Sequence, residues 1–232
     1  MDYILEGIGT ACRLLFTFDP EVYGTLGRSL QFALSATVLG TLVGVPVGFL
    51  IGSANFRGKS FLVTVLNSLM AVPTVIIGLL GYGLFSHRAP LGSFDLLFTP
   101  AVVVVGEFLL ALPLITAFTV SAVHAVDPAA VLTARSLGAG RVAVAWTVLA
   151  EARYGVLAAV IAGFGRAISE VGSAMMLGGN IRFYTRTMTT AIALEVSKGE
   201  FGLGLALGFF LLLVVFSINI VFRALQGRGR MG

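Results

Sequence analysis

The sequence predicts an all-α membrane protein, a polytopic helical bundle with about five core spans and an amino-terminal amphipathic helix. Three totals and one pattern lead to this fold class. Hydrophobic residues make up 57% of the 232 residues, only 11% are charged, and the mean hydropathy is +1.00. A soluble domain carries about 25% charged residues. The apolar residues also gather in long blocks, which indicates a surface that faces membrane lipid.

Five of these blocks are each close to the roughly 20 residues that a helix needs to cross hydrocarbon. They predict spans at about 29–52, 61–85, 100–123, 154–177 and 201–222. The chain is thereby divided into an amino-terminal helix with its lead-in (1–28), a transmembrane domain (29–224) and a basic tail (225–232) that we expect in the cytoplasm.

The segment 3–18 differs from these blocks because charged residues interrupt it. Its apolar side chains can share one helical face, which comprises Leu5, Ile8, Cys12, Leu15 and Phe16. Glu6 and Arg13 interrupt the block, so we expect an amphipathic helix in the membrane interface, with a sixth span as the alternative. Asp19-Pro20 then ends this helix before the first span.

Glycine and proline mark several positions inside the predicted spans. One stripe of glycines recurs every four residues and predicts close packing against a neighbouring helix: Gly40, Gly44, Gly48 and Gly52. Prolines that remove a backbone donor, and so tend to kink a helix, stand inside three spans: Pro46, Pro73 and Pro113. Such kinks occur in moving transporters and in static bundles alike.

The remaining composition excludes several classes of protein. The single cysteine, Cys12, allows no intrachain disulfide and no cysteine-based zinc site. His87 and His124 are far apart without an HExxH motif, so we expect no metal site. The net charge of +4 comes from Lys and Arg in short loops between apolar blocks, where a membrane protein carries them, and we expect no nucleic acid partner.

Two patterns resemble enzyme motifs only superficially. Gly52 and Gly58-Lys59-Ser60 stand one residue too far apart for a phosphate-binding loop, so we expect no ATP site in this chain. Ser121 and His124 lie on one predicted helix, whereas the dyads of intramembrane proteases join different helices. The sequence therefore predicts no catalytic residues.

Three ionisable residues fall inside predicted spans, namely Glu107, Arg166 and Glu170. Intramembrane charges usually face a partner or water, and Arg166 and Glu170 are spaced to pair on one helical face. A structural ion pair, a gate contact and a proton relay are all consistent with this pattern. A relay would indicate a proton-coupled secondary transporter, but that class usually has more spans and an inverted repeat.

The segment 127–153 connects the third and fourth predicted spans. Asp127 with Pro128 is a favourable helix start, and Gly138 is a favourable stop. The result is a short helix exposed between two spans, which suits the docking of a partner protein.

This loop resembles the EAA motif of ABC importer permeases, in which E-A-A is followed by three residues, a glycine, nine residues and I-x-L-P. The pattern falls on Leu132-Thr133-Ala134, on Gly138 and on Val148 to Glu151, where only the alanine and the glycine match strictly. In the family this helix docks into the ATPase subunit. The resemblance therefore implies a set of coupling residues, namely Ala130, Leu132, Thr133, Ala134, Arg135, Leu137 and Gly138.

The stretch from Arg166 to Ile181 and the stretch from Thr185 to Ile192 are similar to the oxyanion branch of this family, most of all to tungstate permeases. Molybdate or sulfate permeases of the same class are the alternative. The resemblance implies a type I importer fold and a homodimer of permeases with an ABC ATPase dimer. It also implies an extracytoplasmic oxyanion-binding protein, ATP and Mg bound by the ATPase alone, and an inner-membrane protein with its amino terminus outside and its carboxyl terminus in the cytoplasm.

The segment after the fourth span offers candidates for the pathway or gate. We expect Gly178 to Asn180 to turn the chain outside the membrane, 185–196 to form a short external helix and Lys198-Gly199 to reverse the chain again. The candidates are Arg166, Ser169, Glu170, Ser173, Asn180, Thr187 and Thr190. The hydroxyls either donate to an oxyanion or satisfy helix backbone. Arg182 and Arg186 either attract anions or pair with the binding protein.

Overall fold

The computed structural model describes residues 2–227, and every regular element within that range is helical. The order along the chain is α1 (Asp2–Thr17), α2 (Pro20–Ser53), α3 (Lys59–Met70), α4 (Thr74–Phe85), the 3-10 turn η1 (Gly92–Phe94), α5 (Pro100–His124), α6 (Pro128–Ser136), α7 (Arg141–Ile168), α8 (Gly172–Gly178), α9 (Met188–Ser197) and α10 (Phe201–Gly227). Arg228 and Arg230, which belong to the predicted basic tail, lie outside the described residues.

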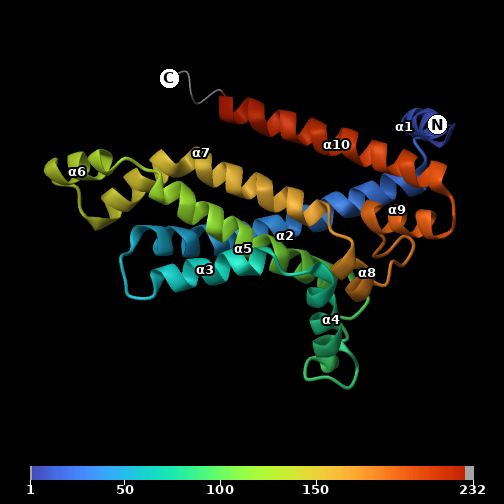
Figure 1. Cartoon of the computed structure of the whole chain (residues 1–232), viewed down its shortest axis with the longest axis horizontal. Helices are drawn as coiled ribbons and strands as arrows, with labels where there is room; N and C mark the ends of the chain where they lie inside the picture. Colours follow the sequence, from blue (N-terminus) through green and yellow to red (C-terminus); the bar gives the residue numbers. More distant parts are fainter. Residues whose placement is uncertain (1, 228–232) are drawn as a thin grey trace.

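Four helices, α2, α5, α7 and α10, are long and apolar enough to cross a membrane, and α3 with α4 makes up to five if that bent pair is one span. The four long helices lie side by side along the long axis of the molecule (Figure 1). The connections α2–α3 and α6 lie at one end of this bundle, whereas α1, α8 and α9 lie at the other. The end that contains the α2–α3 connection and α6 is named here the coupling end, and the end that contains α1, α8 and α9 is named the distal end.

The predicted span at 61–85 is two helices that meet at the proline expected to kink it. It breaks between Met70 and Thr74, and α3 and α4 meet at 92°. Pro73 supplies the reason, because it has no N–H to continue α3 while its carbonyl accepts from Ile76 N at 2.9 Å and starts α4. α4 therefore leaves the bundle at a steep angle (Figure 1). By contrast, Pro46 and Pro113 stand within helices that continue on both sides.

The boundaries of the fourth predicted span, 154–177, also need correction. α7 begins at Arg141, so much of the predicted loop 127–153 is helical, and it ends at Ile168. The chain then breaks at residues 169–171 before the short helix α8. The prediction follows the apolar block, which marks only the part of a helix that lies in hydrocarbon. α7 begins earlier because the more polar segment before that block contains good helix formers.

The first predicted span is likewise shorter than its helix, because α2 begins at Pro20. The side chain of Asp19 accepts from Glu21 N at 2.9 Å and from Val22 N at 3.1 Å, which is a normal helix N-cap. α1 precedes it as a separate helix of 16 residues, about 24 Å long, which is less than the roughly 30 Å of a hydrocarbon core. Gly7 of α1 packs closely on Leu205 of α10.

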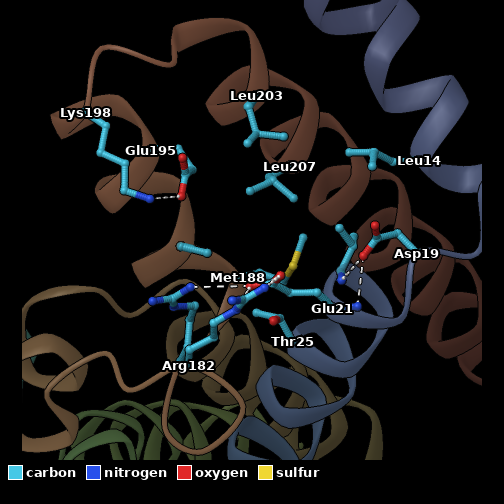
Figure 2. A pocket seen from close by; sticks show the side chains of 13 residues that line it. Leu14, Asp19, Glu21, Thr25, Arg182, Met188, Glu195, Lys198, Leu203 and Leu207 are labelled. Carbon is cyan, nitrogen blue, oxygen red and sulfur yellow. Dashed lines mark hydrogen bonds and ion pairs between the residues drawn. The ribbon is translucent and has the colours of Figure 1, made fainter.

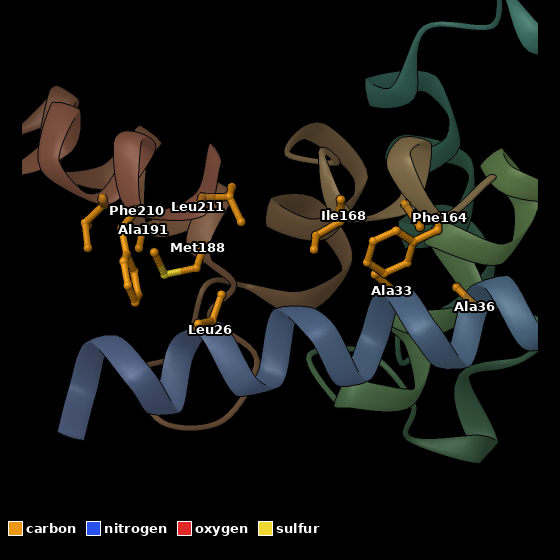
Figure 3. Close-up of a cluster of buried hydrophobic side chains, with 11 residues drawn as sticks. Leu26, Ala33, Ala36, Phe164, Ile168, Met188, Ala191, Phe210 and Leu211 are labelled. Carbon is orange, nitrogen blue, oxygen red and sulfur yellow. The ribbon is translucent and has the colours of Figure 1, made fainter. Parts of the chain in front are cut away.

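The glycine stripe of α2 packs on α5, as the spacing predicts. A Cβ at Gly48 would lie 2.7 Å from the carbonyl oxygen of Thr116 and 2.7 Å from Thr119 Cβ, and one at Gly52 would lie 2.8 Å from Val123. Around this pair the main core joins α2, α7, α9 and α10, and Figure 3 shows Leu26 and Ala33 facing side chains such as Phe164, Ile168 and Phe210. This core fixes the segment after α7 against the start of α2.

Candidate functional site

The first candidate site is α6 at the coupling end, and its two ends follow the local rules. Asp127 Oδ1 accepts from Ala129 N at 2.8 Å and caps the start. At the other end Gly138 has φ 83°, Gly138 N donates to Arg135 O at 3.0 Å, and Ala139 N donates to Ala134 O at 3.0 Å. These two bonds form a Schellman motif, which requires a left-handed residue at the position of Gly138.

α6 has no buried residue, although Val131 is half-buried and packs on the cluster of Val123 and Val148. Leu132 and Leu137 are exposed, the latter to 82%, and so are Thr133 and Arg135. Ala130 and Ala134 are half-buried. The predicted coupling residues therefore lie on an accessible helix, and their role remains a prediction.

Two further exposed residues stand beside α6 that the sequence did not single out. Val142 and Trp146, in the first turns of α7, are 85% and 72% exposed. Their spacing of four places them on one face. The chain has a single tryptophan, and its position near an exposed loop was the signal available for finding it. Leu132, Leu137, Val142 and Trp146 are the exposed large apolar residues of α6, its carboxyl end and the first turns of α7, and this set is named here the coupling surface.

The second candidate site is the break between α7 and α8, where Glu170 joins three elements. Its side chain, in a residue that is 2% exposed, accepts from Arg166 Nη1 at 3.2 Å and from Ser173 N at 2.8 Å, at the start of α8. Its carbonyl oxygen accepts from Thr189 Oγ1 of α9 at 2.5 Å. The predicted pairing of Arg166 with Glu170 is confirmed, and Glu170 additionally holds the two helix ends together.

Buried polar atoms without a hydrogen-bond partner cluster beside this break. Glu107 of α5 is 2% exposed, and its Oε2 has no partner among the described residues. The same holds for Ser173 Oγ, which would lie 3.3 Å from a Cβ at Gly106, the neighbour of Glu107. Ser169, by contrast, is exposed and donates to Arg166 O at 3.1 Å. The break thus contains less complete hydrogen bonding than the helices around it.

The hydroxyls that follow α8 are engaged with the backbone. Thr187 and Thr190 are buried and form a reciprocal capping box at the start of α9. Thr185 Oγ1 donates to Gly178 O at 2.5 Å. In this structure these hydroxyls bond to helix backbone, and a role of Thr187 and Thr190 in the pathway stays a prediction.

The turn between α8 and α9 has the predicted form. Gly179 is left-handed with φ 69°, and Gly199 after α9 is left-handed with φ 85°. Asn180 anchors the turn, because its Oδ1 accepts from Arg186 Nε at 3.2 Å and its Nδ2 donates to Thr190 O at 3.4 Å. α9 begins later than expected, at Met188 in place of Thr185, since Thr187 is the cap.

The third candidate site is a cavity of about 450 Å³ at the distal end, between α1, the start of α2, α9 and α10 (Figure 2). Its polar side is an ion cluster in which Arg182 Nε donates to Glu21 Oε1 at 2.8 Å and Arg186 Nη1 lies 3.5 Å from the same oxygen. Glu21 also raises the pKa of the Arg182 guanidinium by accepting its hydrogen bonds. Leu14, Leu203 and Leu207 form the apolar side, as Figure 2 shows.

Arg182 and Arg186 therefore pair with Glu21 within the chain. Arg28 lies beside them, because its Nε donates to Arg186 O at 3.3 Å. The cavity lining also contains Asp19, Glu195 and Lys198, so its three acidic and three basic side chains balance, and Arg28 beside it adds one positive charge. Among the residues that the structure describes, no three His, Cys, Asp or Glu side chains gather as ligands for a metal ion.

Comparison with known proteins gives consistent matches along the chain. Residues 44–230 match the family described as binding-protein-dependent transport system inner membrane component. The tungstate uptake system permease protein of Peptoclostridium acidaminophilum is 39% identical over 226 residues, which cover 97% of this chain and 99% of that protein. The corresponding protein of Campylobacter jejuni is 37% identical, covering 97% and 95%.

More distant matches concern other anions and the fold. The molybdenum transport system permease protein of Azotobacter vinelandii is 28% identical, covering 86% of this chain and 91% of that protein. A solved structure of an inward-facing methionine ABC transporter superposes with a TM-score of 0.72 at 16% identity, covering 90% of this chain and 95% of that one. At this identity the superposition concerns the fold alone, and the fold is the type I ABC importer fold that the EAA-like loop implies.

Proposed function

The chain belongs to the family of binding-protein-dependent transport system inner membrane components, and on that premise we propose that it is the permease subunit of an ATP-driven importer of tungstate. The observation that supports tungstate as the substrate is the 37–39% identity, over nearly the whole chain, to two tungstate uptake permeases. A molybdenum permease is 28% identical. Molybdate or sulfate carried by the same kind of machine is the alternative.

The coupling surface supports an ATPase partner. Four large apolar side chains stay exposed at this end of the bundle: Leu132 in α6, Leu137 at its carboxyl end, and Val142 and Trp146 in the first turns of α7. Exposed large apolar side chains are typical of a protein interface. In our proposal an ATPase dimer docks here, ATP and Mg are bound by that ATPase, and the permease itself is not catalytic.

A second copy of the chain completes the conduit in this proposal. α3 has no buried residue, and of α4 only Gly78 is buried. Val75, Leu79 and Leu80 of α4 are all exposed, on a helix that meets α3 at 92°. Pairing with a partner permease would cover this surface.

The distal end is proposed as the extracytoplasmic side, where the oxyanion-binding protein delivers its cargo. The support for this placement is that α6, the helix of the EAA-like loop, lies at the opposite end of the bundle. It follows that the amino terminus is outside and the carboxyl terminus is in the cytoplasm.

The test is reconstitution of the permease with the ATPase and the binding protein of the same operon in proteoliposomes. We expect ATP-dependent uptake of tungstate and ATP hydrolysis that the loaded binding protein stimulates. Competition between tungstate and molybdate shows which anion the complex prefers. The two anions have the same shape and charge, so their relative binding affinity is the quantity to compare. Uptake of molybdate in preference to tungstate would favour the alternative. Uptake without ATP, driven by a proton gradient, would contradict the proposal.

A further inference from the structure

A second, larger cavity of about 830 Å³ lies at the coupling end, among the ends of α2 and α5, the start of α3, and α6 and α7. One part of its lining is apolar and comes from the spanning helices, with Phe49 of α2, Val123 of α5 and Val148 of α7. These side chains belong to a buried cluster that also includes Val131 of α6. The cavity floor is therefore continuous with the packing that supports α6.

The other part of the lining is basic. Lys59, His124, Arg135 and Arg141 face the cavity from four elements, and no Asp or Glu is among its lining residues. None of these four side chains pairs with a carboxylate anywhere in residues 2–227. The cavity is thus positively charged at one side and apolar at the other.

Lys59 is held in place at this cavity. Its Nζ donates to Gly52 O at 3.0 Å and to Ala54 O at 2.8 Å, at the carboxyl end of α2. Those carbonyls are the ones that a helix end leaves without internal partners. An ammonium has three donors, so one N–H of Lys59 remains for an anion.

These observations separate the chemical classes of ligand. A small inorganic anion would use the basic side and leave the apolar wall without a partner. A phospholipid with an acidic headgroup matches both sides, because its phosphate meets the cations while its acyl chain lies on the apolar wall that contains Phe49 and Val148. Basic pockets between helices on the cytoplasmic side of a membrane are typical sites for such headgroups.

We propose that this cavity binds an anionic phospholipid of the cytoplasmic leaflet. The inference rests on the proposed function in one respect, since that function places the coupling end at the cytoplasmic surface. The bound lipid stabilises α6 in its docked position, because its chain lies against the cluster that contains Val131. The coupling of ATP hydrolysis to transport then depends on the acidic lipid content of the membrane.

The experiment measures lipid retention by the full permease–ATPase complex. The complex is purified in detergent, mixed with phosphatidylglycerol and phosphatidylcholine, and examined by native mass spectrometry. We expect specific retention of phosphatidylglycerol. The double variant Lys59→Gln/Arg141→Gln should weaken it about 25-fold, since each cation near an anionic lipid surface contributes about fivefold. The matched control is Arg57→Gln, a basic residue of the same loop that does not line the cavity.

A second arm identifies the source of the anion. The ATPase activity of the complex is compared in nanodiscs of phosphatidylcholine alone, of phosphatidylcholine with phosphatidylglycerol, and of phosphatidylcholine with inorganic phosphate added. We expect stimulation by phosphatidylglycerol and none by phosphate. Equal stimulation by phosphate, equal retention of both lipids, or equal losses in the double variant and in Arg57→Gln would overturn the inference. Retention needs no substrate, so a failure of tungstate uptake leaves this readout intact.

Discussion

Replacement of Glu170 by alanine tests whether the break between α7 and α8 is braced as the structure indicates. The carboxylate is buried and accepts from Arg166 Nη1 and from Ser173 N. Breaking a buried ion pair by removing one partner costs about 3–5 kcal/mol. The Arg166 side chain keeps 26% of its surface exposed and can recover solvation, so the lower limit applies, and we expect a loss of about 3 kcal/mol.

The assay is the free energy of unfolding in mixed micelles, measured together with the yield of intact complex and its ATPase activity without substrate. A double-mutant cycle with Arg166→Ala isolates the pair, and we expect a coupling energy of about 1 kcal/mol or more. Glu170→Gln keeps an acceptor for Ser173 N but loses the charge, so it should lie between the wild type and Glu170→Ala. Since α8 loses its anchor, basal ATPase activity should rise.

The control for general effects of removing a carboxylate is Glu200→Ala, because Glu200 is exposed and its replacement should change stability by less than about 0.5 kcal/mol. If Glu170→Ala unfolds like this control, the carboxylate is no brace. If the variant assembles normally and transports faster, Glu170 faces the anion path and repels the dianion, which would refute the reasoning outright.

Three further predictions concern the coupling end, the helix packing and the topology. Gly138→Val should abolish substrate-stimulated ATP hydrolysis without loss of membrane insertion, because a φ of 83° costs a branched residue about 1–2 kcal/mol. The control Gly140→Ala should be neutral, because Gly140 has a φ of −69° and no atom lies within 4 Å of the new Cβ. Gly48→Ala should lower the free energy of unfolding by about 1–3 kcal/mol, because its Cβ would lie 2.7 Å from backbone of α5; unchanged stability would mean that α2 and α5 are not packed this closely. In a cysteine-free background of intact cells, Ser197→Cys should react with an impermeant thiol reagent and Ser136→Cys only after lysis. These exposed serines end α9 and α6, and those helices lie at opposite ends of the bundle (Figure 1). The reverse result would invert the topology.

The sequence predicts best those features that local chemistry determines. α6 begins and ends where Asp127 and Gly138 place its cap and its left-handed stop, and Gly179 ends α8 for the same reason. The glycine stripe of α2 likewise predicts its own partner surface, because only a close neighbour makes such a stripe useful. In these cases a few adjacent residues contain all the information.

Features that depend on tertiary contacts were not predictable. No proline stands at the break after Ile168, which is stabilised by the bond from Thr189 and by the Glu170 side chain, both from outside the helix. The threonines of α9 have the composition of an anion site, yet the capping box uses their hydroxyls, and composition alone does not distinguish the two. The 92° bend at Pro73 is a third example, because a proline predicts a kink without its angle.

The two ends of the molecule are joined by one element, and this has a mechanical consequence. α7 starts five residues after α6 ends and finishes two residues before Glu170, so it is a continuous helix of 28 residues, about 42 Å long, between the coupling surface and the break. We expect a displacement of α6 to be transmitted along α7 to the end that carries Arg166. Near that end, Glu107 Oε2 of α5 and Ser173 Oγ of α8 have no hydrogen-bond partner among the described residues. We therefore predict that motion of α7 changes the structure at the break, where Glu170 bonds to α7, α8 and α9.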